Sequence, residues 1–157
     1  MTRRLVLLNG LPGIGKSTIA RRYAADRPGT LVCDIDLLRT LVSGWESDFS
    51  RAGTLIRPAA LGLIRAYLAE SGDVVLPQLL SRVTELERFE RAAVAAGAAF
   101  VEVMIIDEAY DADRRLRARA AGSQGWANPV LQVGEDVLAG YRAGLAQFAA
   151  PGRRPDW

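Results

Sequence analysis

A glycine-rich segment near the N-terminus carries the clearest chemical signal in this sequence. It follows the pattern G-x-x-x-x-G-K-[ST], in which the last glycine is Gly15 and the next two residues are Lys16 and Ser17. Such glycines let the backbone curl so that several N–H groups point at one phosphate, and the lysine adds a compact cation. The pattern predicts a loop that binds the phosphates of ATP or a related nucleotide, formed by Gly10, Pro12, Gly13, Ile14, Gly15, Lys16, Ser17 and Thr18.

The surroundings of this segment favour a phosphate loop over an incidental glycine turn. Residues 4–9 form a short apolar run typical of a buried parallel strand, and residues 16–26 are predicted to form a helix. The N-terminus of that helix adds positive potential where a phosphate would lie. Lys16 is also the only lysine in the chain, against 19 arginines. Within this loop, the hydroxyl of Ser17 is placed to ligate Mg²⁺.

Two carboxylates, Asp34 and Asp36, follow a second apolar run at residues 30–34. The carboxyl end of a strand in an open parallel sheet faces the ligand crevice, so both side chains are expected near the phosphates. One carboxylate could hold a metal-bound water while the other accepts a proton from a substrate hydroxyl. Alternatively, one of them caps the helix that is predicted to begin near residue 36, and the two roles can coexist.

The composition narrows the chemistry further. The chain has no histidine, which removes the commonest general base and excludes a Cys/His zinc site. Its single cysteine, Cys33, lies in an apolar run and is expected to be a small core residue. Acid–base chemistry therefore falls mainly to Asp and Glu.

Strand and helix patterns alternate along the chain, which predicts an α/β fold with a parallel sheet. Besides the two strands above, we expect strands at 73–77 and 99–106 and a long amphipathic helix over 51–70. Because Pro58 falls inside that pattern, we expect the long helix to kink there or to begin near residue 57. Further helices are predicted at 36–43, 81–96 (capped by Ser81 or Thr84), 111–121 and 133–149.

The loop, and the D-x-D pair that ends 20 residues after Lys16, give the chain a family resemblance. Over residues 4–149 it resembles the small-molecule kinases of the P-loop class, such as shikimate kinase, gluconate kinase, chloramphenicol phosphotransferase and the tunicamycin-resistance ATP-binding proteins. The end-phosphorylating polynucleotide kinases share the loop and a following aspartate. This resemblance implies a three-layer α/β fold with strand order 2-3-1-4 and helices on both faces. It also implies transfer of the γ-phosphoryl group of ATP or GTP, with Mg²⁺, to a hydroxyl of an antibiotic or metabolite.

The resemblance also implies roles for individual residues. Asp36 matches the base that receives the proton of the acceptor hydroxyl, and it is favoured over Asp34, which matches an aspartate near the metal. Residues 111–129 match a lid that closes over the nucleotide, in which Arg115 and Arg119 would neutralise charge on the transferred group. Those two arginines share one helical face, and the alternative is a solvated basic helix.

The third predicted strand departs from many P-loop enzymes, because no carboxylate stands at its carboxyl end. Motor ATPases and GTPases use an aspartate there, so its absence argues against both classes. The metal would then be held by Ser17, phosphates, water and Asp34. Gln78 and Arg82 are predicted to face the crevice and to bond the acceptor, although Arg82 could equally be a solvated residue at a helix start.

The segment 44–57 is expected to shape the acceptor site. Trp45 could stack on a flat acceptor, and Arg57 could bind an anionic one. Arg39 is assigned to the same acceptor set. The alternative is that Trp45 and Phe49 simply pack under the loop.

We predict one domain over residues 1–149, followed by an irregular tail at 150–157. The related kinases usually add a fifth strand after the last helix, and no such run is found here. The fold is expected to be shortened or truncated, or the sheet edge to be covered by another chain, which makes a homodimer through that edge a hypothesis.

The net charge of +2 and the spread of basic residues give little support for a nucleic-acid or membrane partner. Apolar runs are too short for a membrane span or a signal peptide, so a cytoplasmic protein is expected. Two rival functions remain: a polynucleotide or nucleoside end kinase, and a nucleotide-binding resistance or regulatory protein without transfer activity.

Overall fold

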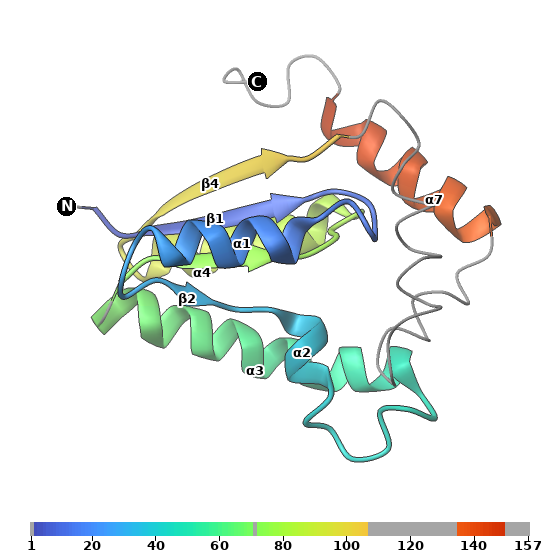
Figure 1. Ribbon diagram of the computed structural model, residues 1–157, viewed down its shortest axis with the longest axis horizontal. Helices are drawn as coiled ribbons and strands as arrows, with labels where there is room; N and C mark the ends of the chain where they lie inside the picture. Colours follow the sequence, from blue (N-terminus) through green and yellow to red (C-terminus); the bar gives the residue numbers. More distant parts are fainter. Residues whose placement is uncertain (1, 71, 107–134, 150–157) are drawn as a thin grey trace.

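A four-stranded parallel sheet forms the centre of the computed structural model, which describes residues 2–70, 72–106 and 135–149 (Figure 1). The strand order is β2-β3-β1-β4, as predicted. The strands are β1 (Arg4–Asn9), β2 (Leu31–Val32), β3 (Val74–Pro77) and β4 (Ala99–Met104). β1 pairs with β3 and with β4, and β2 pairs with β3, all in parallel register. The predicted α/β class and strand order are confirmed.

Apolar side chains on both faces of the central strands hold the layers together. Leu5 and Leu7 of β1 belong to a large buried cluster that includes Ile64 and Phe89 from two helices on one face. Val6 of β1 belongs to a smaller buried cluster on the other face, which contains helix residue Ala20. Since alternate residues of a strand point to opposite faces, one apolar run serves both layers. The result is the predicted three-layer arrangement.

The helices that cover the two clusters lie close to their predicted positions, but some of them begin or end at other residues than predicted. Helix α1 (Lys16–Ala25) covers the smaller cluster, and α3 (Phe49–Glu70) and α4 (Val83–Ala95) cover the larger one. Helix α2 (Ile35–Arg39) is shorter than the predicted 36–43. The described chain ends with α7 (Glu135–Ala146) and a 3₁₀ turn, η1 (Gln147–Ala149).

The expectation that the long helix begins near residue 57 is wrong. Helix α3 begins at Phe49 and continues through Pro58. Its start is set by Asp48, whose Oδ1 accepts a hydrogen bond from the N–H of Arg51 at 2.8 Å, as an N-cap aspartate does. Pro58 is therefore not the start of the helix, because the capping residue Asp48 lies ten positions before it.

The predicted cap of α4 is also wrong. Its N-cap is Arg82, which makes no capping hydrogen bond through its side chain, so neither Ser81 nor Thr84 fills that position. Ser81 instead packs against α7, where a Cβ added at Gly144 would lie 2.8 Å from the Ser81 carbonyl oxygen. The backbone before α4 therefore lies in close contact with α7.

Several predictions fall outside the described residues. These are the lid at 111–129 with Arg115 and Arg119, the helix at 111–121 and the tail at 150–157. Strand β4 lies at one edge of the four-stranded sheet, and a dimer through that edge stays a prediction. In the described ranges, none of the helices combines the length and the apolarity that a membrane span requires.

Candidate active site

The glycine-rich turn after β1 has the backbone geometry that its sequence predicted. Gly10, Gly13 and Gly15 have φ angles of 149°, 80° and 103°, in the region that side chains disfavour. Gly10 has a second constraint, since an added Cβ would lie 2.7 Å from the carbonyl oxygen of Ile105. The turn therefore depends on glycine both for its conformation and for its fit against the chain after β4.

Helix α1 starts directly from this turn. Its N-cap is Gly15, which offers no side-chain oxygen to the first N–H groups of the helix. Lys16 lies at the first position, and its Nζ donates to the carbonyl oxygens of Gly10 and Leu11, both at 2.8 Å. The turn thus places a cation next to a helix N-terminus, which is the arrangement that binds phosphate.

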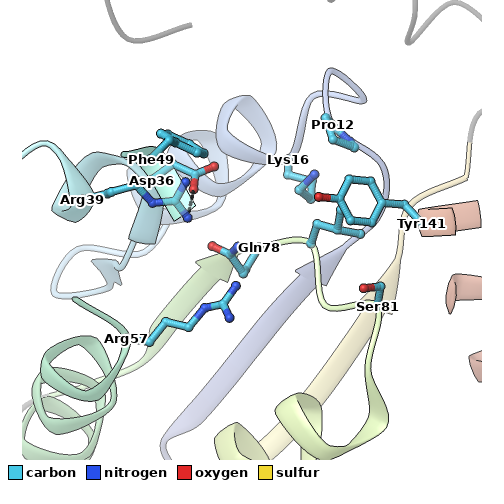
Figure 2. A pocket seen from close by; sticks show the side chains of 10 residues that line it. Pro12, Lys16, Asp36, Arg39, Phe49, Arg57, Gln78, Ser81 and Tyr141 are labelled. Atoms are coloured by element: carbon cyan, nitrogen blue, oxygen red, sulfur yellow. Dashed lines mark ion pairs between the residues drawn. The ribbon is translucent and has the colours of Figure 1, made fainter. Parts of the chain in front are cut away.

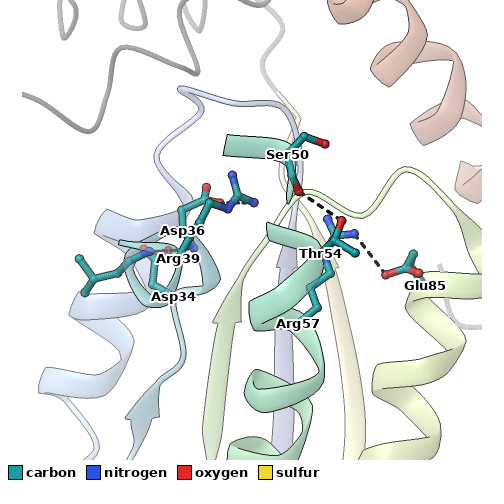
Figure 3. Close-up of polar contacts among 8 residues, drawn as sticks. Asp34, Asp36, Arg39, Ser50, Thr54, Arg57 and Glu85 are labelled. Atoms are coloured by element: carbon teal, nitrogen blue, oxygen red, sulfur yellow. Dashed lines mark hydrogen bonds and ion pairs between the residues drawn. The ribbon is translucent and has the colours of Figure 1, made fainter. Parts of the chain in front are cut away.

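Asp34 connects the turn to the next helix. Its Oδ2 accepts a hydrogen bond from Ser17 Oγ at 3.0 Å. Its Oδ1 accepts from the N–H groups of Asp36 and Leu37, at 3.1 and 3.4 Å, and so caps α2. The capping role predicted as an alternative is confirmed, and Figure 3 shows Asp34 beside Asp36 at the start of α2. The same carboxylate lies against the predicted metal ligand Ser17.

Asp36 lies in the first turn of α2 and forms an ion pair with Arg39, with 3.2 Å between Oδ1 and Nη2. About a third of its side chain (36%) remains exposed. Burial raises the pKa of Asp36 above its ordinary value, Arg39 opposes that rise, and Asp34 adds to it. Weaker attraction from Lys16 and Arg57 also lowers this pKa. A rise in this pKa makes the carboxylate a stronger proton acceptor, which is the direction that suits a general base.

Arg39 is enclosed more tightly than its partner, with only 8% of its side chain exposed. Its guanidinium lies 3.7 Å from the ring centroid of Phe49, in a cation–π contact. Gly53 of α3 makes room for it, because an added Cβ there would lie 2.7 Å from Nη2. Burial lowers the pKa of Arg39, while Asp36 acts in the opposite direction.

Lys16, Asp36 and Arg39 border one pocket of about 240 Å³ between the phosphate turn and α3 (Figure 2). Its wall comprises Pro12, Lys16, Asp36, Arg39, Phe49, Arg57, Gln78, Leu79, Ser81 and Tyr141. Six of them were predicted site residues: Pro12, Lys16, Asp36, Arg39, Arg57 and Gln78. Segments far apart in the sequence thus converge on a single cavity.

Two predicted acceptor residues do not reach this pocket. Trp45 is half-buried, and Arg82 is exposed at the N-cap of α4, and neither borders the cavity. For Arg82, this position agrees with the alternative of a solvated residue at a helix start.

Tyr141, on α7, borders the pocket and was missed from the sequence. Figure 2 shows its hydroxyl directed toward Lys16. The signal was weak, because a lone tyrosine in an amphipathic helix is most simply a core residue. Phe49 and Ser81 were given packing and capping roles, although both border the cavity.

Asn9, the last residue of β1, was also missed. Its side chain is fully buried. Its Oδ1 accepts from the N–H groups of Gly10 and Leu80, at 2.9 and 3.0 Å, and its Nδ2 donates to the Leu80 carbonyl at 3.0 Å. A longer bond of 3.4 Å reaches Glu102 on β4. Asn9 therefore joins the phosphate turn to the segment after β3 and to β4, a role that a polar residue ending an apolar strand could have suggested.

Comparison with protein families gives one match. A family model described as an AAA domain matches residues 5–147, nearly the whole chain. The chain belongs to this AAA domain family. Membership implies nucleotide binding, in agreement with the phosphate turn. Among curated proteins, none matches this sequence.

Solved structures share the fold of this AAA domain. A protein of Chloroflexus aurantiacus described as a kinase candidate matches with a TM-score of 0.66 and 17% identity, covering 85% of this chain and 77% of its own. The Deinococcus radiodurans tunicamycin resistance protein matches with a TM-score of 0.58 and 24% identity, covering 89% and 80%. A chain of the Pnkp1/Rnl/Hen1 RNA repair complex matches with a TM-score of 0.62 and 15% identity, covering 94% and 46%. At these identities the likeness establishes the fold alone.

Proposed function

We propose that this AAA domain is a phosphotransferase that moves the γ-phosphoryl group of ATP or GTP to a hydroxyl of a small molecule. The observation that carries the proposal is that Lys16 and Asp36 border the same pocket. A phosphate-binding cation and a carboxylate of raised pKa thus face one cavity, with room between the turn and α3 for an acceptor. Phosphoryl transfer mainly requires that the reactants are positioned, that the charge on the phosphates is neutralised and that a carboxylate orients or deprotonates the nucleophile.

In the proposed reaction, the acceptor oxygen forms a bond to the γ-phosphorus, and the bond from that phosphorus to the β–γ bridging oxygen breaks. The hydroxyl proton passes to the carboxylate of Asp36, and the nucleoside diphosphate leaves. Lys16 and the N–H groups at the start of α1 hold the phosphates, and Lys16 offsets the negative charge as it shifts to the leaving group. Arg115 and Arg119 of the predicted lid are proposed to add to this neutralisation.

Ser17 and Asp34 would hold the Mg²⁺ that such a reaction uses. Their oxygens are 3.0 Å apart beside the phosphate turn, and oxygen ligands of this kind suit Mg²⁺. Within the described residues no group of three His, Cys, Asp or Glu side chains could hold a metal, so the phosphates and water must complete the set. Bound there, Mg²⁺ would neutralise charge on the β- and γ-phosphates.

The test is a screen of hydroxyl acceptors that follows nucleoside diphosphate release, repeated with Asp36→Asn. We expect this variant to lose at least about a hundredfold in turnover, since a positioned base contributes about that much or more. Its nucleotide affinity, measured by calorimetry, should stay within a few-fold of the parent protein. Asp26→Asn is the matched control, because Asp26 is an exposed carboxylate at the C-terminal end of α1 and does not border the pocket.

Unchanged turnover in Asp36→Asn would reject the assigned base. Tight nucleotide binding with no acceptor-dependent release of diphosphate would favour the rival reading, a nucleotide-binding protein without transfer activity.

A further inference from the structure

Arg57 of α3 is held at the acceptor side of the pocket by a shared acid (Figure 3). Its Nη1 lies 3.6 Å from Oε2 of Glu85, and the other oxygen of Glu85 lies 3.2 Å from Arg88. The buried Nε of Arg57 has no hydrogen-bond partner. Because one carboxylate, Glu85, is shared between two arginines, it offsets only part of their combined positive charge.

The charges that border the pocket do not balance. Among the described residues that border it, Lys16, Arg39 and Arg57 are three cations, and Asp36 is the single carboxylate. Asp36 pairs with Arg39. Even with Lys16 assigned to the nucleotide, the acceptor side keeps the positive charge of Arg57. A cation in a partly enclosed cavity favours an anionic ligand, since the attraction is screened less than at an open surface.

Gln78 provides an independent indication that this pocket binds a ligand. Only 6% of the residue is exposed, its side chain borders the pocket, and its Oε1 has no hydrogen-bond partner. An unsatisfied buried amide oxygen is costly, so a hydrogen-bond donor brought beside it would be stabilised. In Figure 2, Gln78 lies between Asp36 and Arg57. A hydroxyl is the donor that this position suits.

We propose that the acceptor is a small hydroxy compound that also carries a carboxylate or phosphate group, with the anion on Arg57 and the hydroxyl near Gln78 and Asp36. The inference rests on the proposed phosphoryl transfer and names its substrate class. It rests on two features of the pocket: the positive charge of Arg57, which the shared Glu85 offsets only in part, favours an anion, and the unpaired oxygen of Gln78 favours a donor. At about 240 Å³, the pocket lies below the range of about 300–1,000 Å³ that is usual for drug-sized ligands, which fits a compact metabolite.

The test compares matched pairs of probes on the full chain saturated with Mg-ADP. Glycerate is compared with glyceramide, and glycerol 3-phosphate with glycerol, by calorimetric titration. We expect at least one anion to bind about tenfold or more tightly than its neutral counterpart, a difference that one favourable charge contact can supply. The carboxylate and phosphate pairs together distinguish the two kinds of anion.

Arg57→Gln should remove this preference, and Arg57→Lys should keep part of it, because lysine retains the charge but not the paired donors. Arg91→Gln is the matched control: Arg91 is an exposed arginine of α4 that pairs with Glu87 and does not border the pocket, so the preference should persist. Thermal unfolding of each variant checks that the fold is kept, and Arg57→Lys keeps the test usable if Arg57→Gln unfolds.

Equal binding of both members of every pair would overturn the proposal, as would an anion preference that survives in Arg57→Gln. Displacement of the small anions by a lower concentration of a 5′-hydroxyl oligonucleotide would overturn it in favour of a nucleic-acid acceptor. Loss of diphosphate release with the anion preference intact would reject phosphoryl transfer and leave the anion site standing. Failure of the two proposals is therefore distinguishable.

Discussion

At the scale of single residues, Asp36 shows how neighbouring groups shift the pKa of the carboxylate that we propose as the base. Burial and the nearby Asp34 raise its pKa, while Arg39, Lys16 and Arg57 lower it, and the net effect is a rise. Both the burial and the principal opposing charge come from contacts around α2 and α3. The position after a strand predicted that Asp34 and Asp36 lie near the phosphates, and the family resemblance favoured Asp36 as the base. Neither predicted the ion pair with Arg39 that lowers its pKa.

This balance predicts the pH dependence of activity. As a base, Asp36 must be ionised, so kcat/KM should rise with pH through a midpoint above 3.8, the ordinary value for this group. Arg39→Met removes the opposing cation and should move that midpoint to still higher pH. The measurement is the pH profile of kcat/KM for the free enzyme, with Arg27→Met, at the far end of α1, as a control for loss of charge. A midpoint that stays in place or falls in Arg39→Met would contradict the assignment.

At the scale of elements, α3 helps to position the site because one of its residues, Gly53, has no side chain. Gly53 faces the guanidinium of Arg39, and its missing side chain is what allows Arg39 to lie between Phe49 and Asp36. The sequence pattern predicted the amphipathic helix and its buried face, but a glycine in a helix interior gave no sign of which side chain would fill its space. Such a contact depends on tertiary packing, so it could not be read from periodicity.

Two glycine substitutions in α3 should therefore behave differently. Gly62→Ala meets nothing within 4 Å and should raise the free energy of unfolding by about 0.5–1 kcal/mol, because alanine is the better helix former. Gly53→Ala should lower it by about 1–3 kcal/mol through overpacking against Arg39. Urea unfolding of both variants measures the difference.

Gly53→Ala should also move the acid midpoint of kcat/KM upward, as Arg39→Met does, since the displaced guanidinium no longer pairs with Asp36. Equal changes in the free energy of unfolding of the two glycine variants would contradict this prediction. They would show that the Arg39 side chain can move away from residue 53 at no cost in stability.

At the scale of the whole molecule, Asn9 shows why the sheet order and the site depend on one another. It ends the central strand β1, and its side chain bonds the phosphate turn, the segment after β3 and β4. Strand order 2-3-1-4 places those three segments next to one another at the carboxyl edge of the sheet. The apolar runs were enough to predict most element positions, and the family resemblance implied the strand order. The polar contacts at the edge were not predictable, because each joins residues that are far apart in the sequence.

Replacing Asn9 should destabilise the whole fold. Asn9→Ala leaves the N–H and carbonyl of Leu80 and the N–H of Gly10 without their bonds, and buried polar groups left unpaired cost about 1–3 kcal/mol each. We expect a loss of about 3 kcal/mol in the free energy of unfolding, measured with urea. Ser47→Ala, which removes one exposed side-chain bond to Gly44, should change stability by about 0.5 kcal/mol or less. A comparable small loss in Asn9→Ala would show that water replaces the missing amide.

The carboxylate of Asp34 has one more consequence, which concerns how the two proposed substrates affect each other's affinity. One of its oxygens holds the Ser17 hydroxyl, and the other holds the first N–H groups of α2, the helix that carries Asp36. A nucleotide complex that draws on Ser17 must therefore alter the anchor of the helix on the acceptor side. By thermodynamic reciprocity, an acceptor that settles against α2 changes nucleotide affinity by the same factor. Binding of either proposed substrate is thus expected to change the affinity for the other through the side chain of Asp34.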